Sequence, residues 1–230
     1  MISGKLQNYK HFLILSYYSA IWYLYYYTEK TIQPEYLMFS KIDQYIPFVK
    51  CMIIPYVFWY IYIFGALLYL GLRCKDDFFK LSAFLFTGMT LSFILYFIFP
   101  NGQALRPVIM EKDVFSRLIR YIYTIDTPTN SAPSIHVINA MAIHMALARC
   151  KRLEKNKIII SSSFIIMMSI IASTVMIKQH SILDVVYGIG LSTLLYWFIY
   201  NISIFQSLRF FKQLLAYHSK RFLSYLDNKL

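Results

Sequence analysis

Long apolar runs separated by short polar segments dominate the chain. Six runs approach the ~20 residues that a helix needs to cross the hydrocarbon core of a bilayer. They are 11–27, 49–72, 79–99, 132–150, 158–177 and 182–201. The first run is short enough to resemble a signal peptide, but it lacks a small-residue cleavage site and ends in Tyr25-Tyr26-Tyr27, as an interfacial aromatic belt does. The pattern predicts an all-α integral membrane bundle of six transmembrane helices.

The composition supports this class of protein. Hydrophobic residues make up 58% of the chain and charged residues 15%, whereas soluble domains carry roughly 25% charged residues. The formal net charge is +12, but no basic stripe with interleaved aromatic residues lies outside the apolar runs. We therefore expect a membrane partner and no nucleic acid, and the composition leaves open whether the chain forms a homo-oligomer.

The distribution of basic residues predicts the domain organisation and the orientation. We expect one six-span catalytic domain over residues 1–205 and a basic cytoplasmic tail over 206–230, which is either an amphipathic helix on the membrane surface or a frayed end. Fifteen of the 23 Lys and Arg residues fall on the side that holds both termini and loops 73–78 and 151–157. Because cytoplasmic loops are enriched in basic residues, this distribution predicts cytoplasmic termini. We expect the protein to reside in the cell membrane.

Three polar clusters then fall at the opposite, outward face. They are Arg106-Pro107 after the third run, Pro133-Ser134-Ile135-His136 at the start of the fourth, and Lys178-Gln179-His180 with Asp184 between the fifth and sixth. Ionisable residues at membrane depth are costly and usually functional. Their occurrence at one face predicts a shared active site outside the cytoplasm.

The second cluster has the features of an anion-binding helix start. Pro133 suits the first turn of a helix and Ser131 is a plausible N-cap. Free amide groups around Ser134 and Ile135 would point at an anion, and the Ser134 hydroxyl adds a donor. Arg106 offers a planar fork that matches phosphate oxygens.

The remaining residues supply acid–base and nucleophilic groups. His180 and Asp184 are four residues apart, so they share one face of a helix that begins at His180, and the carboxylate can orient the imidazole. His136 is a second imidazole that can protonate a leaving oxygen. Together with the anion-binding groups, these residues favour phosphoryl transfer without a metal or other cofactor.

At these residues the sequence resembles the type 2 phosphatidic-acid phosphatase superfamily. That family shows Lys-x6-Arg-Pro, then Pro-Ser-Gly-His, then Ser-Arg-x5-His-x3-Asp. The matching residues here are Arg106-Pro107, then Pro133-Ser134 and His136, then Ser173, His180 and Asp184. The resemblance implies that His180 is a nucleophile forming a phosphohistidine, that Asp184 orients it, that His136 is the general acid, and that Arg106 and Ser134 bind phosphate.

Three positions depart from the family pattern. Phe99 stands at the position of the first lysine, Ile135 at that of the glycine, and Thr174 at that of the third-motif arginine. Two phosphate-binding cations are therefore missing, and Lys178 is a candidate replacement for one. Loosened motifs of this kind, and the stretch 43–48, resemble the inositol phosphorylceramide and sphingomyelin synthase branch, whose members transfer a phospho-headgroup between lipids.

Several functions stay open at this stage. The leading one is a lipid-phosphate phosphatase acting on phosphatidic acid, phosphatidylglycerol phosphate or a polyprenyl diphosphate. A lipid phosphotransferase, a non-catalytic lipid-binding protein and an intramembrane serine protease using Ser134 are the alternatives. His144 could complete a metal site with His136, His180 and Asp184, but the family chemistry is metal-free. Cys51, Cys74 and Cys150 show neither metal spacing nor a pairing pattern, so we expect small apolar fillers near span ends.

Overall fold

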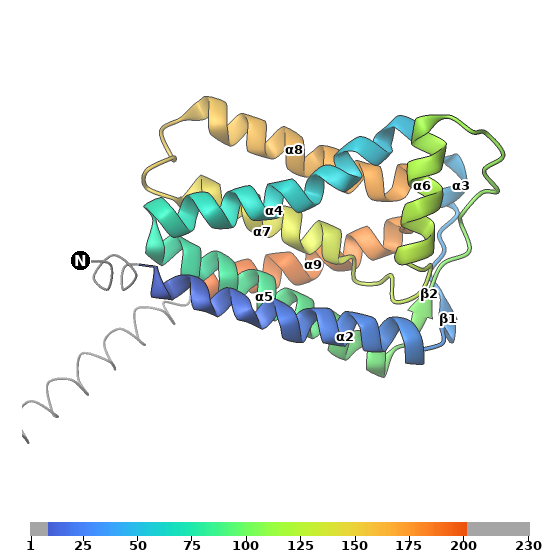
Figure 1. Ribbon diagram of the computed structural model, residues 1–230, viewed down its shortest axis with the longest axis horizontal. Helices are drawn as coiled ribbons and strands as arrows, with labels where there is room; N and C mark the ends of the chain where they lie inside the picture. The colour runs from blue at the N-terminus through green and yellow to red at the C-terminus, as the bar shows by residue number, and fades with distance from the viewer. Residues whose placement is uncertain (1–8, 202–230) are drawn as a thin grey trace, which may run out of the picture.

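The computed structural model describes residues 9–201, which form an elongated bundle of helices (Figure 1). The long elements are η1 Lys10–Ser16, α2 Tyr17–Thr31, α4 Ile53–Arg73, α5 Lys75–Ile98, α7 Ile135–Arg149, α8 Lys157–Met176 and α9 Ile182–Tyr196, which the π-helical turn η3 Trp197–Asn201 continues. The predicted fold class is confirmed, since the described part is almost entirely helical. The predicted tail, 206–230, lies outside the described residues.

The short elements gather at one end of the bundle. They are β1 Tyr36–Leu37, α3 Ile42–Tyr45, η2 Lys50–Met52, β2 Asn101–Gly102 and α6 Val114–Ile125. Strands β1 and β2 pair in parallel, with Tyr36 opposite Asn101 and Leu37 opposite Gly102. This small sheet ties the loop after α2 to the loop after α5 (Figure 1).

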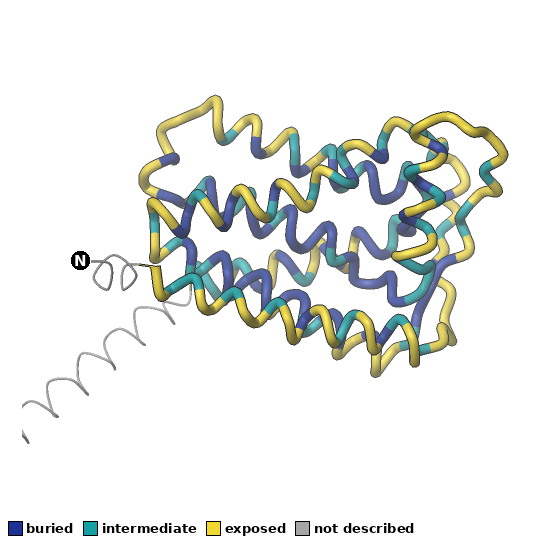
Figure 2. Tube along the Cα trace, viewed as in Figure 1, coloured by how far each residue is buried: buried dark blue, intermediate teal, exposed yellow. Residues whose placement is uncertain are grey.

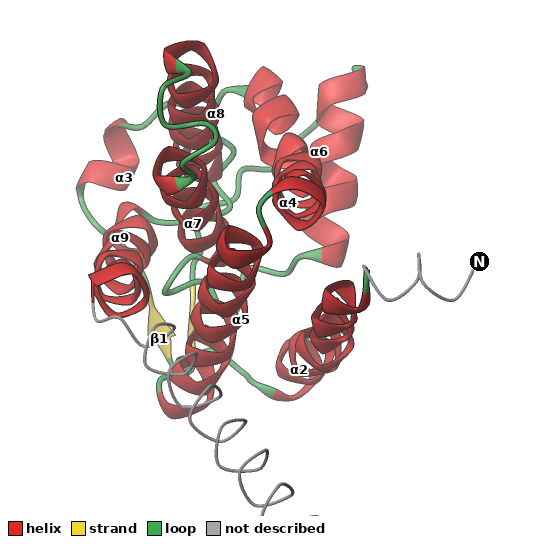
Figure 3. Ribbon diagram, turned by 90° about the vertical axis from the view of Figure 1, so that its left-hand side faces the viewer, coloured by secondary structure: helices red, strands yellow, loops and turns green. Residues whose placement is uncertain are grey.

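Helix α7 lies at the centre of the bundle, where it packs against α4, α5, α8 and α9 (Figure 3). Three of its alanines, Ala140, Ala142 and Ala146, are fully buried, and the buried part of the trace in Figure 2 follows α7 and the faces turned toward it. Small residues allow this close packing. A Cβ at Gly88 of α5 would lie 2.6 Å from Ile138 Cγ2, so the glycine permits the two helix axes to approach.

All six predicted apolar runs form helices, but not all have the length and hydropathy of a membrane span. Within residues 9–201, four helices do: Lys50–Arg73, Lys75–Ile98, Lys157–Met176 and Ile182–Asn201. Helix α7 has 15 residues, which rise about 22 Å, less than the ~30 Å hydrocarbon core. The first helix is rich in tyrosine, whose hydroxyl lowers its hydropathy. The four candidate spans fit an integral membrane protein, while the six-span count and the orientation stay predictions.

Two local expectations at helix starts are wrong. Ser131 does not cap α7, which begins at Ile135 with Ser134 at the N-cap position. The buried side chain of Asn101 instead holds the preceding loop, because its Oδ1 accepts from the amides of Ser131 and Ala132 at 3.0 and 2.8 Å. The second expectation was that a helix begins at His180. His180 instead precedes α9, which begins at Ile182 after a capping box formed by Ser181 and Asp184.

Candidate active site

His180 and Asp184 form a hydrogen-bonded pair even though the histidine lies outside the helix. His180 Nδ1 lies 3.1 Å from Asp184 Oδ2, and the Ser181 amide donates to the same oxygen at 3.0 Å. Both side chains are buried, Asp184 completely. A carboxylate on Nδ1 selects the tautomer that carries its proton there. The Nε2 atom of His180 is therefore left with a free lone pair.

His136 lies in the first turn of α7 and faces His180. The two ring centroids are 5.6 Å apart. Two aromatic rings of α4, Tyr56 and Trp59, pack against the His136 ring at 4.5 and 4.4 Å between centroids. His136 Nε2 is buried without a hydrogen-bond partner. Because a buried polar atom normally has a partner, this nitrogen is placed to meet a bound molecule.

The start of α7 has unused donors beside these histidines. The Ser134 hydroxyl is buried and has no partner, and the Ser134 amide donates to Asp184 O at 3.1 Å. The amides of residues 135–137 lie in the first helical turn, where N–H groups have no intrahelical acceptor. This is the arrangement of free donors that the sequence predicted, and its binding of an anion stays a prediction. Since no histidine is bonded to Ser134, the hydroxyl lacks the base that a serine nucleophile requires.

Arg106 reaches the same region, but its guanidinium already has partners. It donates to the carbonyls of Tyr123 (2.9 Å) and Asp126, and to Gln179 Oε1 at 2.8 Å. It also lies 4.3 Å from the centroid of the Tyr123 ring. Burial lowers the pKa of Arg106, yet an arginine stays charged. The side chain thus fastens the loop before α7 to the residue next to His180, and its buried Nε has no partner.

Lys178 is held by a different loop. Its ammonium donates to the carbonyls of Asp43 and Ile46 at 2.7 and 2.5 Å, and its backbone has a positive φ of 57°. Burial lowers the pKa of Lys178. The structure brings four of the six predicted residues together: His136 and His180, called the histidine pair below, with Asp184 and Ser134. Arg106 reaches only Gln179, next to His180, and the Lys178 ammonium lies against the loop that contains α3.

Two buried polar residues that each form several hydrogen bonds, Asp43 and Asn101, were not among the predicted site residues. Asp43 accepts from Ser181 Oγ at 2.7 Å and from the amides of Ile182 and Ser40, both at 2.8 Å. Asn101 fixes the loop that leads to Ser134, as described above. Asp43 falls in the stretch 43–48 that the sequence had marked only weakly. No periodic pattern distinguishes Asn101, because its partners depend on the conformation of the loop.

Both histidines line one cavity of about 630 Å³. Most of its lining is apolar and comes from η1, α2, α4, α5 and α7; the polar residues of the lining include Glu29, Asp126, Asn130 and Asn139. The cavity follows the first helix from Phe12 to Glu29, and 17 residues of helix rise about 25 Å. The apolar lining therefore extends along most of the first helix and reaches the two histidines.

Fold and site together define a protein whose described residues, 9–201, are mostly helical, with apolar helices of spanning length and two histidines on one apolar cavity. The family model of the PAP2 superfamily matches residues 83–207, more than half of the chain. The chain belongs to this superfamily, as its motifs predict. No curated protein and no solved structure shows a significant match. Membership supports an enzyme of the phosphatase or phosphotransferase type that acts on lipids.

Proposed function

We propose that the chain is a metal-independent lipid-phosphate phosphatase that hydrolyses a phosphomonoester or diphosphate of a membrane lipid. The observation that carries this proposal is the placement of His136 and His180 on one apolar cavity. The histidines supply the two groups that phosphoryl transfer through a covalent intermediate needs. The cavity supplies a place for the lipid chain, so that the phosphate lies at the polar end.

The first half of the reaction uses the Nε2 atoms of both histidines. His180 Nε2 attacks phosphorus, a P–N bond forms, and the P–O bond to the lipid breaks. The leaving oxygen takes a proton from His136. Asp184 stabilises the positive charge that develops on the His180 ring, since its carboxylate lies 3.1 Å from Nδ1. Amides of residues 135–137 and the Ser134 hydroxyl hold the equatorial oxygens.

The second half returns the enzyme to its starting state. A water molecule gives a proton to the now neutral His136 and attacks phosphorus, and the P–N bond breaks to release phosphate. Positioning and electrostatic stabilisation suffice for such a transfer, because the transition state requires little further covalent chemistry from the protein.

The test is phosphate release from a panel of lipid phosphates by the full chain, purified in detergent with chelator. We expect release by the parent and by His144→Ala, and none by His180→Ala. His144 is a matched control because it lies on α7 two turns from His136, with Nδ1 3.1 Å from Ser163 Oγ. Equal activity of the parent and a well-folded His180→Ala variant would refute the proposal.

Lipid phosphotransfer is the second candidate function, and the small number of free Lys and Arg side chains at the site favours it. The family lysine and arginine positions hold Phe99 and Thr174, while Arg106 and Lys178 donate to carbonyl groups. A phosphodiester carries one negative charge where a phosphomonoester carries up to two, so a site with few free cations suits a diester headgroup donor. The resemblance to the inositol phosphorylceramide and sphingomyelin synthase branch is consistent with this candidate.

An acceptor assay separates the two functions. The full chain is incubated with a headgroup-labelled phospholipid, with and without a lipid alcohol. Labelled lipid product that requires the alcohol would establish transfer, whereas a labelled, water-soluble phospho-headgroup released without the alcohol would establish hydrolysis. Lipid binding that persists in His180→Ala, with no turnover by the parent in either assay, would identify a non-catalytic lipid-binding protein.

A further inference from the structure

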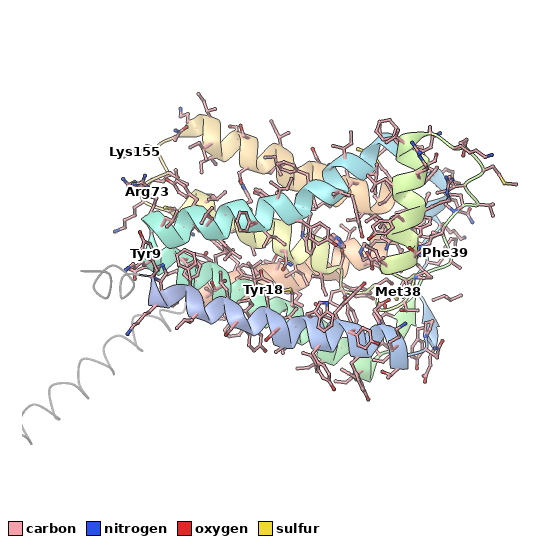
Figure 4. The ribbon with its side chains drawn as sticks, viewed as in Figure 1. Tyr9, Tyr18, Met38, Phe39, Arg73 and Lys155 are labelled. Carbon is pink, nitrogen blue, oxygen red and sulfur yellow. The ribbon has the colours of Figure 1, made fainter. Side chains whose placement is uncertain are left out.

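Two cysteines and an aspartate converge at the end of the bundle that lies away from the histidine pair. Cys150 Sγ lies 3.1 Å from Cys74 Sγ, and a carboxylate oxygen of Asp77 completes a group whose atoms all lie within 4.8 Å of one another. Arg73, which precedes Cys74, is labelled at this end of the bundle in Figure 4, whereas Met38 and Phe39 are labelled at the opposite end. The sequence alone predicted that Cys74 and Cys150 are small apolar fillers near span ends.

The backbone of three helix ends presents these side chains to each other. Cys74 joins α4 to α5, and its amide donates to Leu70 O at 2.7 Å. Asp77 follows in the first turn of α5. Cys150 ends α7, and its carbonyl accepts from the amides of Leu153 and Glu154. Because each residue belongs to the end of a helix, its Cα position is well defined.

We propose that Cys74, Asp77 and Cys150 form a binding site for a thiophilic divalent cation, for which Zn²⁺ is the natural probe. With Zn–S bonds of about 2.3 Å and Zn–O bonds of about 2.0–2.2 Å, tetrahedral ligand atoms lie roughly 3.5–3.8 Å apart. The atoms observed here are separated by 3.1 to at most 4.8 Å. Small side-chain rotations therefore bring all three into the coordination sphere.

The charges of this site also suit a bound cation. On binding, each thiol releases its proton to solvent, so two thiolates and one carboxylate meet the two positive charges and leave one negative charge. Arg73, Lys75, Arg149 and Lys151 flank the ligands in sequence and favour that negative complex. Water takes the fourth position, because Cys74 and Asp77 are partly exposed. Cys150 is fully buried, which shields its bond to the metal.

The site would join the α4–α5 connection to the end of α7. His136 lies at the opposite end of α7. The metal would therefore fix the position of the helix that carries the proposed general acid, and it would not contact the substrate. The bound metal would contribute to folding because the ligands are brought together only in the folded chain.

The test is a titration of the reduced, metal-free full chain in detergent with Cd²⁺, followed by the thiolate-to-metal charge-transfer absorption and by competition with Zn²⁺. We expect saturation at about one equivalent for the parent and for Cys51→Ser, whose cysteine is exposed. The double substitution Cys74→Ser and Cys150→Ser should abolish the absorption. Asp77→Asn should weaken binding at least tenfold, since even the loss of a group that only hydrogen-bonds to a metal ligand typically costs about 10–100-fold in affinity.

A second measurement needs no variant and so does not depend on the folding of one. Zn²⁺ should slow alkylation of Cys74 but not of Cys51, as read by peptide mass spectrometry of the parent. The proposal is overturned if the absorption is absent, if it survives the double substitution, or if Zn²⁺ leaves both alkylation rates unchanged. None of these readings involves lipid turnover, so they stand apart from the proposed enzymatic function.

Discussion

Substitution of Asp43 by alanine should destabilise the protein and disturb the histidine pair. The buried carboxylate of Asp43 accepts three hydrogen bonds, two of them from Ser181 and Ile182 at the start of α9. A hydrogen bond to a charged group contributes about 1.5–3 kcal/mol. Because bonds that share one side chain are not additive, we expect a loss of at least about 3 kcal/mol in the free energy of unfolding.

The assay is thermal unfolding of the parent and variants in the same detergent. In a chain of this size each 1 kcal/mol changes Tm by about 2–4 °C, so Asp43→Ala should lower Tm by about 6–12 °C. Asp43→Asn should cost less, about 1–3 kcal/mol. Its carbonyl oxygen still accepts from Ile182, but its NH₂ group cannot accept from the Ser40 amide.

The control is Glu35→Ala, which removes an exposed carboxylate from the loop between α2 and α3. We expect its Tm to stay within about 2 °C of the parent, because surface substitutions usually change stability by less than ~0.5 kcal/mol. If the Tm of Asp43→Ala also stayed within about 2 °C of the parent, the reasoning that the Asp43 carboxylate holds the start of α9 would be refuted. Retention of full activity by Asp43→Ala would refute the link to His180.

Three further predictions follow from the site and the packing. His136→Ala should lower kcat by about 10²–10⁴-fold with little change in KM, and by less for a substrate whose leaving group needs no protonation; an equal loss for both substrates would contradict a general acid. Gly188→Ala places a methyl group 3.0 Å from Val137 of α7. The overpacking should destabilise the fold by about 1–3 kcal/mol, of which the better helix propensity of alanine offsets roughly 1 kcal/mol. Gly190→Ala has nothing within 4 Å of the new methyl group and should therefore raise Tm. The hydrogen bond from Lys50 holds the pKa of Asp113 well below its ordinary 3.8, so its stabilisation is present above pH 3.8 and is lost as the pH falls through the lower folded-state pKa; Asp113→Asn should flatten Tm against pH in that acidic window, and an unchanged profile would contradict it.

Hydropathy was sufficient to predict where the six long helices lie, but it did not predict the short helices α3 and α6, which fall between the apolar runs. Each of the six apolar runs is a helix within a few residues of its expected bounds, because a long run without charge must satisfy its backbone groups internally. The pairing of His180 with Asp184 was also predictable, since four residues separate them. The assumed reason was incomplete, because His180 precedes α9 and the capping box at Ser181 turns Asp184 back toward it.

Sequence patterns could not predict which hydrogen-bond acceptors the individual cationic side chains have. Arg106 and Lys178 were expected to bind phosphate as the available cations. In the structure, both donate to carbonyls of neighbouring loops, and their role in substrate binding stays a prediction. Loop carbonyls have no periodicity in sequence, so only the folded loop shows which cation meets them.

The sequence by itself determined the class of the chain, its long helices and the residues that can do chemistry, because hydropathy and local spacing act over a few turns of helix. The tertiary structure decided which groups meet. It turned Asp43 toward the start of α9, Asn101 toward the loop before α7, and Cys74 toward Cys150, 76 residues away. Contacts of this kind depend on how whole helices pack against each other. The small buried residues of α7 allow neighbouring helices from distant parts of the sequence to pack closely against it.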